Sequence, residues 1–176
     1  PRYGSSAASD VYKRQDYTLL MNFIKVILAK EPIISALGAF LCISLIAFIN
    51  SYDDFNIWLI PPFGATMVLV MAVYESPLAQ PKNIFFGHIL SALSGVLIYF
   101  FLGMSFLSIG LAVAISVWVM MITKTIHPPA GANPIIAILG GKGISFILLP
   151  VATGALIIIV FAVIYNKILK RNYPKK

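Results

Sequence analysis

Charged side chains are scarce in this chain of 176 residues. Only 11% of the residues are Asp, Glu, Lys or Arg, whereas about 25% is usual in a soluble domain. Hydrophobic residues make up 60% of the chain, and this composition excludes a soluble globular protein. The net charge is +7, but so few basic groups cannot cover a nucleic-acid-binding face. We therefore expect a lipid bilayer as the surroundings and no nucleic acid as a partner.

Cysteine and histidine are also rare, which limits the chemistry. The single cysteine, Cys42, lies in an apolar run, so an intramolecular disulfide is excluded and the redox compartment stays open. The two histidines do not form a metal-binding cluster, and the sequence lacks a glycine-rich phosphate loop and a pair of acidic residues within one apolar helix. We expect no metal, no cofactor and no enzymatic activity, because no motif supports a hydrolase built on Ser91 or Ser94 with His127.

Long apolar runs dominate what is present. A helix needs about 20 apolar residues to cross the hydrocarbon layer, with about 17 as the lower limit. Four stretches qualify, at residues 33–50, 84–102, 109–126 and 144–165, and two further apolar segments, 58–74 and 128–139, are shorter and interrupted by proline and glycine. This pattern predicts an all-α, polytopic membrane helix bundle.

The two interrupted segments share a Pro-Pro-x-Gly-Ala pattern followed by a small polar residue. The first reads Pro61, Pro62, Phe63, Gly64, Ala65, Thr66 and the second reads Pro128, Pro129, Ala130, Gly131, Ala132, Asn133. Residues 91–98 and 150–157, which follow them in the same order, also align. We interpret this as an internal duplication, so that the bundle consists of two repeated halves, each with a broken or re-entrant segment.

Basic residues near the apolar runs predict the orientation. Lys25 and Lys30 precede the first run and five basic residues occupy 167–176, so the positive-inside rule places both termini in the cytoplasm. If both interrupted segments cross the membrane, there are six crossings and the halves are inverted; if both are re-entrant, there are four and the halves are parallel. Six crossings are favoured because they place Lys82 and Lys124 inside.

The domain organisation follows from these runs. Residues 1–15 are polar and have no apolar core of the length that a signal peptide needs. They are either an artefact of cloning or sequence assembly, or a disordered tail. We expect a cytoplasmic segment at 16–32, one membrane region at 33–166 and a basic cytoplasmic tail at 167–176.

The helix breaks can expose backbone amides. A helix that starts at membrane depth leaves its first N–H groups without partners, so such an end must face protein or a watery cavity. Asn133 followed by Pro134 predicts a helix start, with Asn133 as the N-cap, and Thr66 is the aligned residue. Gly64 and Gly131 remove a side chain beside these amides, and two such ends would form an anion site. Alternatively, these residues only bend and pack the helices.

Three ionisable residues are candidates for the same region. His127 adjoins the second break and is either a donor or proton carrier for an anion, or a structural cap. His88 shares a helical stripe with Ser91 and Gly95 and is either a pathway residue or a packing histidine. Lys124 lies near His127 if the helix continues through it, and it either attracts an anion or snorkels to the interface.

Three motifs resemble those of one known family. They are residues 125–134, which read TIHPPAGANP, residues 62–66, which read PFGAT, and residues 75–81, which read ESPLAQP. Together they resemble the HPP family of integral membrane proteins, named for its His-Pro-Pro motif, over nearly the whole of 32–165. The resemblance implies a small transporter-like protein, usually described with four spanning helices, and some members are associated with nitrite transport.

We therefore expect a transporter of a small monovalent anion, with nitrite implied by the family resemblance alone. Its expected location is the inner or plasma membrane of a bacterium, and a homo-oligomer is compatible with the small-residue helix faces. A passive channel and a structural or assembly protein remain as alternatives. The expected substrate-binding residues lie at the two breaks and are Gly64, Ala65, Thr66, His127, Gly131, Ala132 and Asn133, with His88 and Lys124 as pathway residues and Pro61, Pro62, Pro128, Pro129 and Pro134 as structural ones.

Overall fold

The structure is a computed structural model that describes residues 21, 24, 29–52 and 58–175. The predictions for residues 1–15 lie outside the described residues. The chain divides into two units, residues 1–37 and 38–176. The helix α2 (Lys30–Ser51) begins in the first unit and ends in the second, and all other described elements belong to the second unit.

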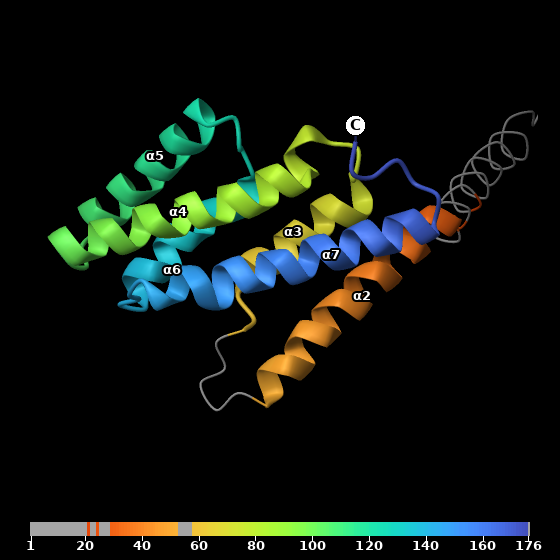
Figure 1. The fold of residues 1–176 in the computed structure, drawn as a ribbon, viewed down its shortest axis with the longest axis horizontal. Helices are drawn as coiled ribbons and strands as arrows, with labels where there is room; N and C mark the ends of the chain where they lie inside the picture. The colour runs from red at the N-terminus through yellow and green to blue at the C-terminus, as the bar shows by residue number, and fades with distance from the viewer. Residues whose placement is uncertain (1–20, 22–23, 25–28, 53–57, 176) are drawn as a thin grey trace, which may run out of the picture. The chain divides into compact units, whose positions relative to one another are not determined.

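Helices make up all regular structure of the described residues, which confirms the all-α prediction (Figure 1). After α2 the order is α3 (Pro61–Ala72), the short 3₁₀ helix η1 (Pro77–Ala79), α4 (Pro81–Leu102), α5 (Phe106–Ile122), the 3₁₀ helix η2 (Pro128–Ala132), α6 (Asn133–Leu139), the π-helical segment η3 (Ile147–Ala152) and α7 (Thr153–Ile168).

Three helical stretches are long and apolar enough to cross a bilayer: Lys30–Ser51, Pro81–Leu102 and Ile147–Ile168. The last joins η3 to α7 and begins and ends later than the expected 144–165. The third expected span, 109–126, corresponds to α5, which has 17 residues, begins earlier than expected, at Phe106, and ends earlier, at Ile122. The number of crossings stays a prediction.

A Schellman turn ends α5 before Lys124. The Thr125 N–H donates to the Met120 carbonyl over 2.9 Å, and the Lys124 N–H donates to the Met121 carbonyl over 3.2 Å. Lys124 adopts the left-handed conformation with φ of 55°, which such a turn requires and which glycine usually supplies. The chain therefore leaves the helix three residues before His127, so the condition under which Lys124 was expected to lie near His127, a helix continuing through both, is not met.

Both Pro-Pro pairs begin a helix, whereas the sequence pattern predicts interruptions at both pairs and a helix start at Asn133, with Thr66 aligned to it. Pro61 and Pro62 occupy the first turn of α3, and Pro128 and Pro129 occupy that of η2. Proline fits there because the first N–H groups of a helix have no intrahelical acceptor and the ring fixes a helical φ. The duplication of the two halves stays a prediction.

The helix α4 is the centre of the second unit. It packs against α5, α6, α7, η1, η2 and η3, and Figure 1 shows it running between α5 and α7. Its buried face carries small or polar residues, among them Gly87, His88, Ser91 and Gly95. This face is the stripe that the sequence predicts, and it lets neighbouring helices approach closely.

Candidate functional site

Two glycines of α4 bring the second break against it. A Cβ atom at Gly87 would lie 2.8 Å from the Cβ of His127 and 2.9 Å from the carbonyl oxygen of Thr125. A Cβ atom at Gly95 would lie 2.5 Å from the Cα of Pro134. Any side chain at these positions would push the backbone of the second break away from α4. The close approach of His127 and Asn133 to α4 therefore depends on these two glycines.

The side chain of Thr66 joins the two breaks. Its Oγ1 atom lies 2.9 Å from the Nε2 of His127 and 3.0 Å from the Nε2 of His88. It also lies 3.1 Å from the carbonyl oxygen of Pro62, one turn earlier in α3. Residues from α3, α4 and the start of η2 thus meet at one hydroxyl.

A backbone carbonyl fixes the ring of His127. The Nδ1 atom lies 2.8 Å from the carbonyl oxygen of Leu78, in η1. A carbonyl only accepts hydrogen bonds, so Nδ1 carries a proton, and the Nε2 of a neutral ring is then an acceptor. His127 has non-helical backbone angles at the start of η2, but its side chain makes no capping hydrogen bond there. It anchors the second break to η1 and to α3.

The side chain of Asn133 fixes the ring of His88. Its Nδ2 atom lies 3.0 Å from each of three atoms: the Nδ1 of His88, the carbonyl oxygen of His88 and the Oγ of Ser91. The carbonyl requires the amide nitrogen, not the oxygen, to face α4. The Nδ1 of His88 therefore accepts a hydrogen bond, and its Nε2 carries the proton that faces Thr66.

Asn133 does not cap a helix, so the N-cap prediction is wrong. Its backbone is already helical, and the residue in the N-cap position of α6 is Ala132, which makes no side-chain cap. Tertiary contacts with α4 use the amide nitrogen instead. The Oδ1 of Asn133 is buried without a hydrogen-bond partner among the described residues, and such an oxygen suits a hydrogen-bond donor.

These four side chains form a closed cluster that we call the Thr66 cluster: Thr66, His88, His127 and Asn133. Each is 0% exposed. The ring of Phe63 meets that of His88 edge-on at 5.6 Å, and the two imidazole centroids are 5.0 Å apart. A Cβ atom at Gly154 of α7 would lie 2.2 Å from the ring of Phe63, so this glycine makes room for it. In such apolar surroundings each hydrogen bond is strong and each unpaired charge is costly.

The predicted backbone sites lie at the edge of this cluster. Gly64 and Ala65 are exposed on the side of α3 away from the buried Thr66, and Gly131 and Ala132 are partly exposed. A Cβ atom at Gly64 or Gly131 would have no neighbour within 4 Å, so open space adjoins both glycines. The structure thus brings together Thr66, His88, His127 and Asn133 through their side chains and leaves the glycine backbones accessible.

The remaining predicted residues divide between core and surface. Pro62, Pro129 and Pro134 are buried, whereas Pro61 and Pro128 are exposed. Lys124 is exposed at the left-handed turn after α5. No third His, Cys, Asp or Glu joins the two histidines in a metal-binding group within the described part of the chain.

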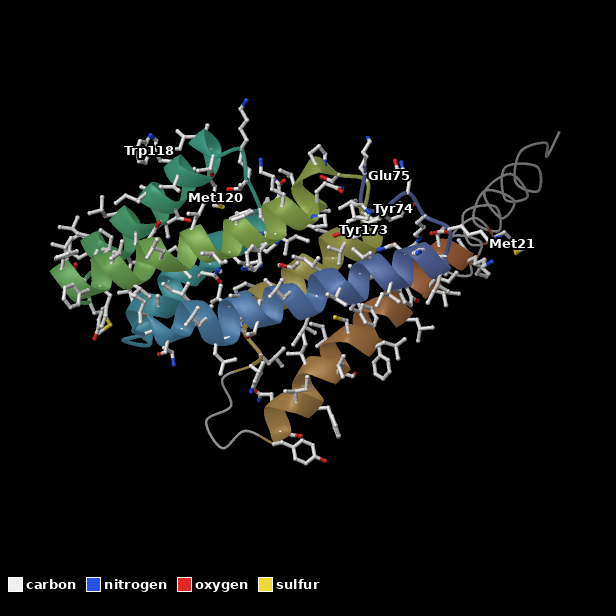
Figure 2. The ribbon with its side chains drawn as sticks, in the orientation of Figure 1. Met21, Tyr74, Glu75, Trp118, Met120 and Tyr173 are labelled. Carbon is white, nitrogen blue, oxygen red and sulfur yellow. The ribbon has the colours of Figure 1, made fainter. Side chains whose placement is uncertain are left out.

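The loop between α3 and α4 positions His127. The contacts by which it does so were not predicted from the sequence. It supplies the Leu78 carbonyl, and the side chain of Asn83 donates to the carbonyl of Ile126 over 2.9 Å. Residues after α7 hold this loop: the Tyr173 hydroxyl donates to the carbonyl of Ala79, and Arg171 lies over the ring of Tyr74. Figure 2 shows Tyr74, Glu75 and Tyr173 gathered there. Backbone acceptors leave no signal in a sequence.

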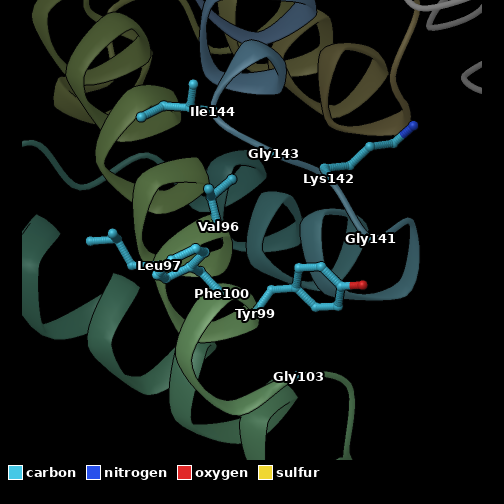
Figure 3. A pocket seen from close by; sticks show the side chains of 9 residues that line it. All are labelled: Val96, Leu97, Tyr99, Phe100, Gly103, Gly141, Lys142, Gly143 and Ile144. Atoms are coloured by element: carbon cyan, nitrogen blue, oxygen red, sulfur yellow. The ribbon is translucent and has the colours of Figure 1, made fainter.

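A cavity of about 680 Å³ lies elsewhere, at the other end of α4 (Figure 3). Side chains of α4, including Val96, Tyr99 and Phe100, line it together with Lys142 and Ile144. Its walls are mostly apolar, and it includes no member of the Thr66 cluster.

Comparisons with known proteins agree on one family. The family described as HPP, transmembrane region, matches residues 25–174. Two Dictyostelium discoideum proteins, each described as a transmembrane protein, are 36% identical over 143 residues and 35% identical over 152 residues. These alignments cover 76% and 80% of this chain but 50% and 49% of the relatives, so the chain spans about half the length of the curated relatives it matches. No solved structure matches it.

Proposed function

Because the chain belongs to the HPP transmembrane region family, we propose that it carries a small monovalent anion, such as nitrite, across a membrane. The binding site is the surface between Gly64 and Ala65 of the first break and Gly131 and Ala132 of the second. The Thr66 cluster, which joins the two breaks, lies beside this surface.

The joining of the two breaks by buried polar side chains supports this proposal most directly. Polar and ionisable side chains at membrane depth are costly and usually mark a substrate or ion pathway. Thr66, His88, His127 and Asn133 come from four elements and converge within hydrogen-bond distance. A bundle that only needed bent helices could use apolar residues at these positions, without the cost of desolvating two imidazoles.

The glycines give an anion access to backbone amides. Both Gly64 and Gly131 lie in the first turn of a helix that begins at Pro-Pro, where N–H groups carry the partial positive charge of the helix start. The Cβ position of both glycines is open, which leaves room beside the backbone, and the neighbouring amides of Phe63 and Ala130 donate to the carbonyls of Ile60 and His127. In this proposal the amides replace part of the hydration of the anion, and His127 adds a positive charge when it binds a proton, because both of its ring nitrogens already contact Thr66 and Leu78.

Alternating access requires the two halves to move against each other. We propose that they are repeats related by inversion, with six crossings and both termini in the cytoplasm, and that rocking about the Thr66 cluster exposes the site to each side in turn. That this membrane is the inner or plasma membrane of a bacterium stays a prediction. A homo-oligomer would present the exposed apolar faces of the helices to a second copy or to lipid.

Counterflow of labelled nitrite into proteoliposomes tests the proposal. We expect uptake above that of protein-free liposomes, saturation with concentration and competition by other small anions. A non-saturating flux would indicate a passive channel instead, and flux equal to that of protein-free liposomes would indicate a structural or assembly role.

Replacement of Gly131 by Leu tests the backbone site. The side chain fits, because a Cβ atom has no neighbour within 4 Å, but it would cover the adjacent amides. We expect Gly131→Leu to reach the membrane and to lose uptake. Gly110→Leu is the matched control, since Gly110 of α5 also has open space at its Cβ position. Uptake by Gly131→Leu equal to that of the control would contradict the backbone site.

A further inference from the structure

The hydrogen bonds around the Thr66 hydroxyl have one acceptor atom more than the hydrogens available to them. The Leu78 carbonyl requires a proton on the Nδ1 of His127, and the Asn133 amide requires a proton on the Nε2 of His88. With neutral rings, His88 donates to Thr66, and the single hydroxyl hydrogen of Thr66 faces two acceptors. These are the Nε2 of His127 at 2.9 Å and the carbonyl oxygen of Pro62 at 3.1 Å.

One added proton would satisfy every one of these contacts. If it forms an N–H bond at the Nε2 of His127, both imidazoles donate to the Oγ1 of Thr66, which has two lone pairs. The Thr66 hydroxyl then rotates about its C–O bond, and its hydrogen moves from the His127 nitrogen to the Pro62 carbonyl. No heavy atom has to move, and no bond of Thr66 is broken.

We propose that the Thr66 hydroxyl is a two-position switch that lets His127 bind one proton, and that this proton enters and leaves together with the transported anion. The inference rests on the proposed function and deepens it by naming the coupling ion. The proton comes from water on the side where the anion enters. It returns to water on the other side when the N–H bond at Nε2 breaks.

Burial makes the coupling obligatory. An imidazolium in a site that is 0% exposed is strongly disfavoured unless an anion neutralises it. An anion at the same depth is equally disfavoured without a counter-charge. Each ion therefore binds well only when the other is present, and a carrier with this property moves the two in the same direction.

Among the described residues, no negatively charged side chain beside His127 could take the place of the transported anion as its counter-ion. His127 lies against Thr66 of α3, His88 of α4 and the backbone carbonyl of Leu78. Phe63 packs on the His88 ring, and Met120 and the Thr125 carbonyl lie beside Gly87. His88 is the one other titratable side chain in this contact set. The charged residues Glu75, Lys82 and Lys124 of the adjoining segments are exposed.

Nitrogen NMR of the purified chain in lipid nanodiscs tests the switch without any transport assay. The chain has two histidines, so ¹⁵N-histidine labelling gives two sets of ring signals, which a His88→Gln variant assigns. At alkaline pH we expect opposite tautomers, with the proton on Nδ1 of His127 and on Nε2 of His88. On acidification we expect only His127 to become an imidazolium. Sodium nitrite should raise the midpoint pH of this transition, and sodium chloride at equal ionic strength should raise it less.

Three results would overturn the switch. They are the same tautomer in both rings, protonation of both rings together, and a His127 transition that nitrite does not move. Thr66→Val should abolish the single protonation because it removes the hydroxyl, and Thr66→Ser should retain it. If Thr66→Val does not fold, the wild-type spectra and the serine variant still decide the question.

Proteoliposomes that contain a pH-sensitive dye test the coupling. An inward nitrite gradient should acidify the interior in wild type and in Thr66→Ser, and Thr66→Val should reduce this acidification by about ten-fold or more. Nitrite flux without acidification beyond that of protein-free liposomes would reject proton coupling but keep the transporter. Absence of nitrite flux in wild type would reject the proposed function, and the NMR titration would still decide whether His127 binds its proton.

Discussion

Thr66 shows how much one hydroxyl can contribute when it is completely buried. It contacts two imidazoles and one carbonyl, so three elements of the bundle depend on a single side chain. A hydroxyl suits this position because it donates one hydrogen bond and accepts two. A carboxylate would only accept, and an amide is bulkier, so neither could serve both histidine rings in the same space.

Substitution of Asn133 distinguishes a helix cap from a member of the cluster. Asn133→Ala removes the donor to His88 and Ser91 and should lower the free energy of unfolding by about 1–3 kcal/mol. Asn133→Asp is the decisive variant. Aspartate is as good an N-cap as asparagine, but its oxygens would face the carbonyl of His88. We expect Asp to be no better than Ala in thermal unfolding in detergent, and recovery of stability by Asp would support a cap.

At the residue scale, the sequence predicted the members of the cluster but not their partners. Thr66, His88, His127 and Asn133 each stand out as polar residues in apolar segments. Their hydrogen bonds join positions that are 22, 45 and 61 residues apart, and no local pattern encodes such distances. The Asn-Pro signal predicted an N-cap by a local rule, and the long-range bonds to α4 prevailed over it.

The helix α4 owes its central position to the small residues on its face. Gly87 and Gly95 allow His127 and Pro134 to lie against the helix at distances that any Cβ atom would prevent. Glycine lowers the intrinsic stability of a helix by about 1 kcal/mol relative to alanine. The close approach of the second break offsets this cost.

Gly95→Ala should therefore destabilise the bundle although alanine favours helices. The new Cβ atom would lie 2.5 Å from the Cα of Pro134 and 2.9 Å from the Cβ of Ala137, and overpacking of this kind costs about 1–3 kcal/mol. The matched control is Gly110→Ala in α5, where the Cβ position is open, and where the substitution should gain up to about 1 kcal/mol. In thermal unfolding in detergent, Gly95→Ala should lower the melting temperature and Gly110→Ala should raise it. A change in the same direction for both variants would contradict the packing account.

At the element scale, helix starts were predicted only in part. Pro-Pro marks the beginnings of α3 and η2 because proline fits the first turn, whereas the sequence pattern predicted interruptions at both pairs and a helix start at Asn133, where α6 begins. The end of α5 was predicted too late, at Ile126 instead of Ile122, although Thr123, Lys124 and Thr125 already interrupt the apolar run. The helix ends where Lys124 adopts a left-handed conformation, which its residue type does not indicate. That turn directs the chain back toward α4 and brings His127 into the core.

At the scale of the molecule, composition predicted the surroundings correctly. Large apolar side chains are exposed along several helices, and Trp118 of α5 is 62% exposed whereas Met120, two residues on, is 4% exposed (Figure 2). Lipid tails are the natural partners of such a surface. The buried core is also mostly apolar, and the polar Thr66 cluster within it supports the proposed pathway through the second unit.

The arrangement of the two breaks was predictable only in part. The repeated Pro-Pro-x-Gly-Ala pattern predicted that they converge, and Thr66 and His127 do meet. The pattern also predicted that backbone amides face one another, whereas side chains fill the meeting point and the glycines lie at its edge. A short polar residue at a helix start can point toward the bundle or away from it. Packing against α4 decides which direction its side chain takes.

Counterflow of labelled nitrite by wild type and His127→Ala in proteoliposomes tests the central claim most directly. Ser116→Ala is the matched control, because Ser116 is buried but its hydroxyl has no partner among the described residues. We predict uptake by wild type and by the control. His127→Ala should lose at least about ten-fold, equivalent to about 1.4 kcal/mol, because it removes the positive charge that His127 supplies to the anion. Uptake by a folded His127→Ala protein equal to that of the control would contradict the account.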